Sequence, residues 1–156
     1  MKLCKAILFI LMLPVMVACE SEPGKVSSIT EAASLLETSE GLVRTYVEGD
    51  AYIDVDVQSI THAITNPASR SEEISSDDVA KMKAAVYRFY KNVTVKDSCY
   101  YCPVKNGSEI NISDRVFSAL SDNLQEMNDF IKKVKDKGEP VTIPEVDEEY
   151  LNSLLK

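Results

Sequence analysis

One stretch of the chain repeats its apolar residues at helical spacing, and this stretch limits the fold more than any other feature. Between Ser113 and Lys137, six apolar residues follow one another at intervals of three, four, three, four and three, so they share one face of a helix. They are Phe117, Leu120, Leu124, Met127, Ile131 and Val134. Because such a helix is not stable alone in water, the fold must provide an apolar partner for this face.

The residues at both ends of this stretch are those that helices prefer there. Ser113 suits the N-cap, and Asp114 favours the positive end of the helix dipole. Gly138, followed by Pro140, provides a stop. Four lysines favour the negative end of the dipole: Lys132, Lys133, Lys135 and Lys137. The sequence therefore predicts a helix from about Ser113 to Lys137.

A second helix is predicted from about Ser76 to Val95. Its apolar residues repeat at intervals of three, four, three and four, namely Val79, Met82, Val86, Phe89 and Val93. Asp77 and Asp78 follow Ser76 and favour the first turn. The end of this helix stays open, because Val93, Thr94 and Val95 also suit a strand.

Three further segments predict shorter or interrupted helices. A helical pattern runs from Ile29 to Val47, with an interruption expected near Glu40 and Gly41. Residues 51–65 give both a strand signal, through alternating Ile53, Val55 and Val57, and a helix signal, through Ile53, Val57, Ile60 and Ile64. We predict a helix here, ended by Asn66-Pro67. A short amphipathic helix is expected to open at Pro144 and to align Val146, Tyr150 and Leu154.

Together these segments predict a mainly α fold, a small bundle of four to five helices. The alternative is an α+β fold, in which the two long helices pack on a small antiparallel sheet built from residues 42–58 and 92–112.

The start of the chain has the pattern of a secretory signal. Lys2 and Lys5 are followed by an uncharged, largely apolar run of thirteen residues, 6–18. As a helix this run rises only about 20 Å, too short for a hydrocarbon core of about 30 Å. It is therefore predicted to be a signal peptide rather than a membrane span.

The end of that segment, Met16-Val17-Ala18-Cys19, resembles the signal of bacterial lipoproteins, which reads Leu, a small residue, Gly or Ala, then Cys. Ala18 and Cys19 match this pattern, whereas Met16 and Val17 depart from it. The resemblance implies cleavage before Cys19, lipidation of that residue and a stable membrane anchor. It also implies an outer-membrane location, because Glu20 is not the aspartate that usually signals inner-membrane retention. The alternative is cleavage after Cys19, which would release a secreted protein.

The predicted organisation is a signal peptide over residues 1–18, a lipidated cysteine with a flexible tether over 19–28, and one acidic domain over 29–156. Removing the signal removes Lys2 and Lys5 and no acidic residue, so the formal charge changes from −8 to −10. This charge argues against nucleic acid as a partner, because nucleic-acid binding depends on Lys and Arg. A basic protein is the better-matched partner, beside the membrane that holds the lipid anchor.

Cys99 and Cys102 form the most suggestive motif of the domain. In an oxidising compartment we expect them to form a disulfide that staples the surrounding loop. The alternative is thiol–disulfide exchange, but the turn-like VKNGSE that follows does not favour a helix start there. A zinc site needs four ligands, and His62 is the only histidine. We therefore predict no metal and no cofactor.

Three aspartates, Asp50, Asp54 and Asp56, raise the question of calcium. The pattern starts like an EF-hand loop and then fails, since Ser59 stands at the glycine position and Thr65 at the glutamate position. The acidic pairs Glu72-Glu73 and Glu148-Glu149 diverge on a helix, and no catalytic motif is present in the sequence. Three Asn-x-Ser/Thr sequons begin at Asn92, Asn106 and Asn111.

These observations predict a membrane-anchored bacterial lipoprotein with no catalytic residues, whose domain is a non-enzymatic binding module of the cell envelope. Two alternatives stay open. One is an envelope immunity or inhibitor protein that neutralises a basic toxin or hydrolase. The other is a thiol–disulfide oxidoreductase that uses Cys99 and Cys102.

Overall fold

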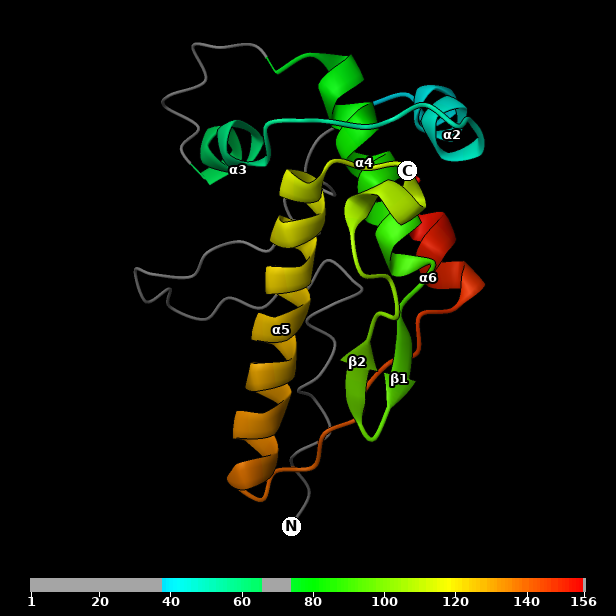
Figure 1. Cartoon of the computed structure of the whole chain (residues 1–156). Coiled ribbons are helices and arrows are strands. Elements are labelled where there is room, and N and C mark those ends of the chain that lie inside the picture. Colours follow the sequence, from blue (N-terminus) through cyan, green and yellow to red (C-terminus); the bar gives the residue numbers. More distant parts are fainter. Residues whose placement is uncertain (1–37, 66–73, 156) are drawn as a thin grey trace.

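The structure is a computed structural model, and it describes residues 38–65 and 74–155, without the side chains of 62–65. This part of the chain forms five α-helices and one small hairpin, which lies beside α5 (Figure 1). The helices are α2 (Glu40–Glu48), α3 (Val57–Thr65), α4 (Ser76–Tyr90), α5 (Asp114–Asp136) and α6 (Glu148–Ser153). The predicted mainly α fold is thus confirmed, with a small antiparallel sheet in addition.

Helix α5 is the longest element and keeps its predicted bounds to within one residue. The Ser113 hydroxyl accepts a hydrogen bond from the amide of Val116, and Gly138 ends the helix with a φ of 75°. The buried side chains of α5 are Val116, Leu120, Leu124, Ile131 and Val134. Four of them, Val116, Leu120, Leu124 and Ile131, join one core with residues of α4, of the hairpin and of α6.

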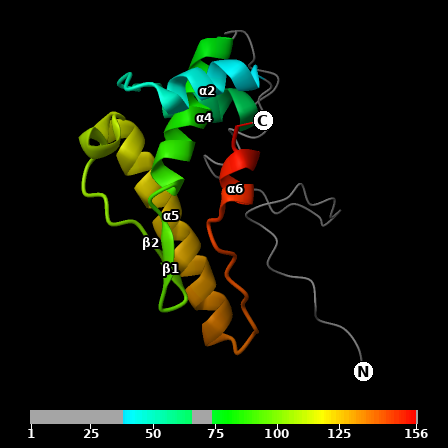
Figure 2. The ribbon, with the colours of Figure 1, turned by 90° about the vertical axis from the view of Figure 1, so that its right-hand side faces the viewer.

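The hairpin and the C-terminal segment lie next to each other beside α5. Figure 1 shows the hairpin and the connection that leads to α6 on the same side of α5, the side that faces the viewer in Figure 2. The hydroxyl of Tyr100 in β2 donates to the carbonyl of Pro144 in that connection at 3.0 Å. Aromatic rings also pack α4 against α5 and against α6. Phe89 meets Phe117 edge-on, and Tyr90 meets Tyr150 edge-on, each pair with its ring centroids 5.7 Å apart.

The hairpin corrects the predicted end of α4. The helix ends at Tyr90 rather than near Val95, and β1 (Thr94–Lys96) pairs in antiparallel register with β2 (Cys99–Tyr101). The β-branched residues of 93–95 favour this extended conformation. Asp97 and Ser98 form the turn with φ angles of 51° and 59°, the left-handed conformation of tight hairpin turns. The alternative sheet was therefore right in part, because it included residues 92–112.

Residues 51–65 divide between the two predicted conformations. The helix prediction is wrong for residues 51–56, which are extended, and right from Val57 onward, where α3 begins. Ile53 forms a parallel bridge with Ile112, donating to the carbonyl of Asn111 and accepting from the amide of Ser113. Ile53, Val55 and Val57 are buried, as their alternation predicts. Apart from this bridge, residues 42–58 add no described strand.

The two short helices also begin at other positions than predicted. Helix α2 starts at Glu40, where the sequence predicts an interruption, and the earlier part of that prediction lies outside the described residues. Helix α6 starts at Glu148 rather than at Pro144, because the Asp147 side chain accepts a hydrogen bond from the amide of Tyr150 and caps the helix there. None of the helices in the described ranges is both long and apolar enough to span a membrane.

Candidate functional site

The residue with the most specific predicted role, Cys19, lies outside the described residues. So do Glu72 and Glu73, and the side chain of His62 is not described either. Among the side chains that are described, no three His, Cys, Asp or Glu residues lie close enough together to hold a metal ion.

Cys99 and Cys102 are free cysteines, so the predicted disulfide is not present in the structure. Cys99 belongs to β2, and Cys102 directly follows that strand. An extended strand advances about 3.3 Å per residue, which separates residues three apart by about 10 Å, whereas a disulfide needs Cα atoms within about 7 Å. The pairing of β2 with β1 therefore keeps the two sulfurs apart.

The environment of Cys102 also does not match a reactive thiol. Burial raises the pKa of the Cys102 thiol, and the carboxylate of Glu109 raises it further. A nucleophilic cysteine needs the opposite shift, because its thiolate is the reactive species. The raised pKa therefore does not favour Cys102 as the nucleophile of a thiol exchange.

Two of the three candidate calcium ligands have structural roles. Asp54 forms an ion pair of 2.9 Å with Arg115, and hydrogen bonds from Ser113 and Arg115 lower the pKa of its carboxyl group. Asp56 caps α3, accepting hydrogen bonds from the amides of Gln58 and Ser59, and these bonds together with the Ser59 hydroxyl lower its pKa. The third, Asp50, lines a hollow of the described surface.

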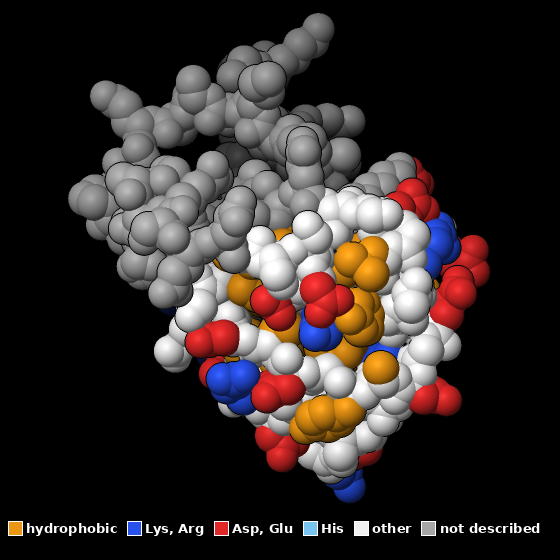
Figure 3. All heavy atoms as spheres, turned by 90° about the horizontal axis from the view of Figure 1, so that it is seen from above, with side chains coloured by type: hydrophobic (Ala, Val, Ile, Leu, Met, Phe, Trp, Pro, Cys, Tyr) orange, Lys and Arg blue, Asp and Glu red, His pale blue; other side chains and the backbone are white. Residues whose placement is uncertain are grey.

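One face of the described domain carries acidic and basic side chains together. On the face shown in Figure 3, the Asp and Glu side chains of the described residues lie scattered, with Lys and Arg side chains between them. Some of these charges link elements. Asp77 of α4 accepts a hydrogen bond from the Tyr46 hydroxyl of α2 and forms an ion pair of 2.6 Å with Lys81.

The most unusual polar group of the described structure is Arg88, in the last turn of α4. Its side chain is only 9% exposed, and its two terminal nitrogens donate to four backbone carbonyls. One nitrogen donates to Ala51 and Asn111, both at 2.9 Å, and the other donates to Tyr46 and Gly49, both at 2.5 Å. The planar, forked guanidinium can hold several acceptors at once, which a lysine cannot do in the same way.

These four carbonyls explain how a cation is accommodated here without a carboxylate in direct contact. The carbonyls of Tyr46 and Gly49 lie at the end of α2, where the helix dipole is negative. Burial lowers the pKa of Arg88, while the nearby carboxylate of Asp50 raises it. Arg88 thus joins α2, the extended segment 50–56, α4 and the start of α5.

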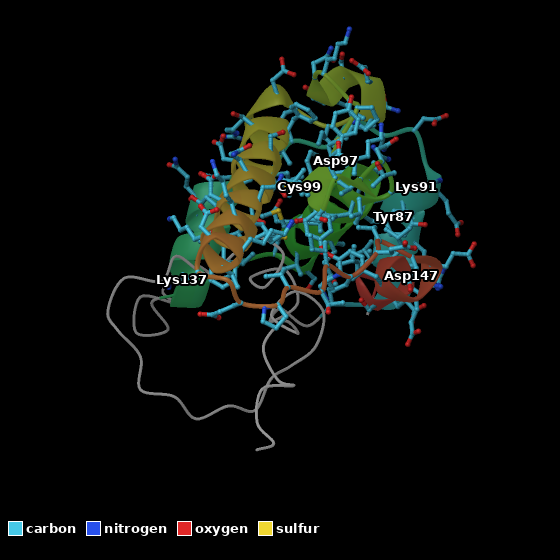
Figure 4. The ribbon with its side chains drawn as sticks, turned by 90° about the horizontal axis from the view of Figure 1, so that it is seen from below. Tyr87, Lys91, Asp97, Cys99, Lys137 and Asp147 are labelled. Atoms are coloured by element: carbon cyan, nitrogen blue, oxygen red, sulfur yellow. The ribbon has the colours of Figure 1, made fainter. Side chains whose placement is uncertain are left out.

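A hollow of about 280 Å³ lies beside Arg88 and is open to solvent. Three segments line it: residues 47–50 at the end of α2, residues 87–92 at the end of α4, and residues 110–111 before α5. Figure 4 shows two of its residues, Tyr87 and Lys91, on one side of the molecule, with Lys137 on the opposite side.

The polar groups of the hollow include both hydrogen-bond donors and acceptors. Glu48 at the end of α2 and Asp50 after Gly49 contribute carboxylates. Lys91 and Asn92, which directly follow α4, contribute an ammonium group and an amide. Asn111, whose φ is 54°, adds a second amide. This set can bind a small polar ligand, and it is the candidate site of the described domain.

Two of the three sequon asparagines, Asn92 and Asn111, thus line the hollow. The Asn92 amide donates to the carbonyl of Arg88 at 2.8 Å. The third, Asn106, donates to Glu109 at 3.0 Å before the short 3-10 helix η2 (Gly107–Ile110). These side-chain hydrogen bonds give Asn92 and Asn106 structural roles in the described domain.

Neither Arg88 nor the hollow was predicted from the sequence. The partners of Arg88 lie 23 to 42 residues away along the chain, so no local spacing connects them. The one local signal is an arginine inside the aromatic run of Tyr87, Phe89 and Tyr90, which places a cation next to core residues.

Comparisons of the chain with protein-family models, with curated proteins and with solved structures found no match.

Proposed function

We propose that this chain is a lipid-anchored protein of the bacterial cell envelope, and that its domain is a non-enzymatic interaction module. The observation that carries the proposal is the junction Ala18-Cys19 at the end of a short apolar segment with a basic start. Two or three acyl chains on Cys19 would hold the protein stably at a membrane. The outer membrane is the proposed location, because the residue after the cysteine is Glu20 and not the aspartate that usually signals inner-membrane retention.

Metabolic labelling with an alkyne fatty acid tests the anchor. The full chain, expressed in a bacterial host, should incorporate the label and separate with the membrane fraction. Cys19→Ala should abolish both labelling and membrane association. Cys4→Ala is the matched control, because it removes a cysteine inside the predicted signal, and it should leave both unchanged. Labelling that persists in Cys19→Ala would overturn the proposed anchor.

Density-gradient separation of the two membranes tests the location. The labelled wild-type chain should be found with outer-membrane markers. Recovery of the whole labelled pool with inner-membrane markers would contradict the outer-membrane assignment and leave the anchor itself in place.

A second candidate function is the neutralisation of a basic protein, such as a toxin or hydrolase of the envelope. It is favoured by the acidic balance of 25 Asp and Glu against 17 Lys and Arg. Exposed carboxylates are dense before and in the first turn of α6, at Glu145, Asp147, Glu148 and Glu149. Complementary charge speeds association and makes it sensitive to salt.

Co-purification from native membranes at several salt concentrations tests this second function. A basic protein should be recovered at low salt and lost progressively as sodium chloride is raised towards about 1 M, where the Debye length is about 3 Å. A partner that is retained regardless of salt, or that is itself acidic, would argue against charge-driven neutralisation.

A further inference from the structure

The hollow beside Arg88 presents opposite charges from different elements. Glu48 and Asp50 bring two carboxylates, and Lys91 brings an ammonium group. An anion bound here would lie near the carboxylates, and a cation would lie near Lys91 and the guanidinium of Arg88. Because like charges at an interface cost free energy, this arrangement disfavours ligands that carry a single charge.

Arg88 itself does not attract an anion into the hollow in the usual way. The four N–H groups of its terminal nitrogens are occupied by backbone carbonyls. Its role is to fix the backbone of α2 and of residue 111 relative to α4. A site whose walls are already fixed loses less conformational entropy when it binds a ligand.

A neutral ligand with several hydroxyl groups matches the polar groups that remain. A hydroxyl can donate to Glu48 or Asp50 and can accept from Lys91. The amides of Asn92 and Asn111 can do both, and the ring of Tyr87 offers a flat, partly exposed surface.

The size and openness of the hollow limit the ligand to about one ring. Its volume of about 280 Å³ lies just below the range of typical ligand sites, about 300–1,000 Å³. Aliphatic side chains line it only at Val47 and Ile110, which is too little apolar surface for an acyl chain. We propose that the hollow binds one neutral saccharide unit, either a free sugar or part of a glycan chain. This inference deepens the proposed interaction module and rests on it only for the expectation that envelope glycans are nearby.

Nuclear magnetic resonance of the full chain with Cys19→Ala tests the site without its lipid, so it can fail independently of the proposed anchor. N-acetylglucosamine and its β-1,4-linked trimer are titrated while the side-chain amide signals of Asn92 and Asn111 are followed. We expect saturable shifts confined to the hollow, at millimolar concentrations. Tighter binding of the trimer would identify a glycan chain, and equal binding would identify a free sugar.

Two variants and one control connect the shifts to the hollow. Asp50→Ala removes an acceptor, and Asn111→Gly removes an amide while tolerating the φ of 54°. Each should weaken binding roughly 2- to 10-fold, the range of one hydrogen bond. Asp122→Ala, on the exposed side of α5, should bind as the parent chain does.

Three results would overturn the proposal. The first is the absence of saturable shifts in the hollow while the spectrum shows a folded chain. The second is a stronger response to sodium sulfate or methylammonium than to either sugar, which would identify an anion or cation site. The third is unchanged sugar binding in both Asp50→Ala and Asn111→Gly, with their spectra showing the parent fold.

Discussion

At the scale of single residues, Arg88 makes four hydrogen bonds to backbone carbonyls that lie 23 to 42 residues away along the chain. Its guanidinium satisfies four carbonyls, two of them at the end of α2 and one just before α5. If the side chain were lost, these carbonyls would be left without their donors in a nearly buried place, and such groups are costly. Arg88 is therefore expected to contribute to stability as well as to the shape of the hollow.

Arg88→Lys should lower the free energy of unfolding by about 2–4 kcal/mol, because one ammonium group cannot replace four directed N–H groups. Urea denaturation followed by circular dichroism measures this change. Arg44→Lys is the control, since Arg44 pairs with Glu40 on the exposed surface of α2 and its replacement should have little effect. A stability loss in Arg88→Lys no larger than in the control would contradict the stabilising role of the Arg88 hydrogen bonds.

Two buried tyrosines make a matched pair at the same scale. The hydroxyl of Tyr100 donates to the carbonyl of Pro144 at 3.0 Å, whereas the buried hydroxyl of Tyr150 has no hydrogen-bond partner among the described residues. Tyr100→Phe should therefore destabilise the fold by about 1 kcal/mol, while Tyr150→Phe should be neutral or stabilising. Thermal unfolding of both variants checks the order, and the reverse order would contradict it.

At the scale of elements, the hairpin depends on α5 as well as on its own two strands. The side-chain amide of Asn128 accepts from the amide of Tyr100 at 2.8 Å and donates to the carbonyl of the same residue at 2.9 Å. These are the two groups that a third strand would bind. Asn128 thus satisfies the edge of β2 and attaches the hairpin to the helix.

Asn128→Ala should detach β2 from α5 and lower the stability by about 1–3 kcal/mol, because two backbone groups lose their partner. Hydrogen exchange is the sharper measurement, since the amide of Tyr100 should exchange much faster in the variant. Gln125→Ala removes an exposed amide of the same helix and serves as the control. If Tyr100 exchanges equally in both variants, the attachment lies elsewhere.

The hairpin also decides the state of its two cysteines. Because the strand separates Cys99 from Cys102, both of these residues should be free thiols in the folded chain. Alkylation during unfolding without reductant, followed by mass spectrometry, should show both residues modified. A mass lower by two hydrogens, with neither residue modified, would mean that the local disulfide forms and that β2 is distorted.

At the scale of the whole molecule, the buried tyrosines Tyr100 and Tyr150 make the stability of the fold depend on pH in the alkaline range. Burial raises the pKa of Tyr100 to about 12, and burial raises that of Tyr150 as well. In the unfolded chain, tyrosine has a pKa of about 10. The unfolded state therefore loses these protons first, and their contribution to stability is fully present below about pH 10 and declines as the pH rises towards 12.

The melting temperature should accordingly fall between about pH 10 and 12. The melting temperature of Tyr100→Phe should fall less steeply than that of the wild-type chain over this range, because one of the titrating groups is absent. Tyr52→Phe is the control, since Tyr52 is exposed. Equal slopes in all three proteins would show that the buried phenols do not govern the alkaline transition.

The helices that could be predicted are those whose signals are local. In α5 the cap, the apolar repeat and the stop lie within one stretch, and helical hydrogen bonds connect residues only four apart. The end of α4 and residues 51–56 could not be assigned in this way. Their β-branched residues fit a helix or a strand, and the choice depended on β2 and on Ile112, which lie elsewhere in the chain.

The candidate site shows the same division. The leader pattern, the acidic balance and the two long amphipathic helices could be predicted from the sequence, because they are properties of composition and of short spacings. The separation of Cys99 from Cys102 and the four carbonyl partners of Arg88 became apparent only in the folded chain. A guanidinium selects its acceptors by their positions in space, and those positions exist only once the helices have packed.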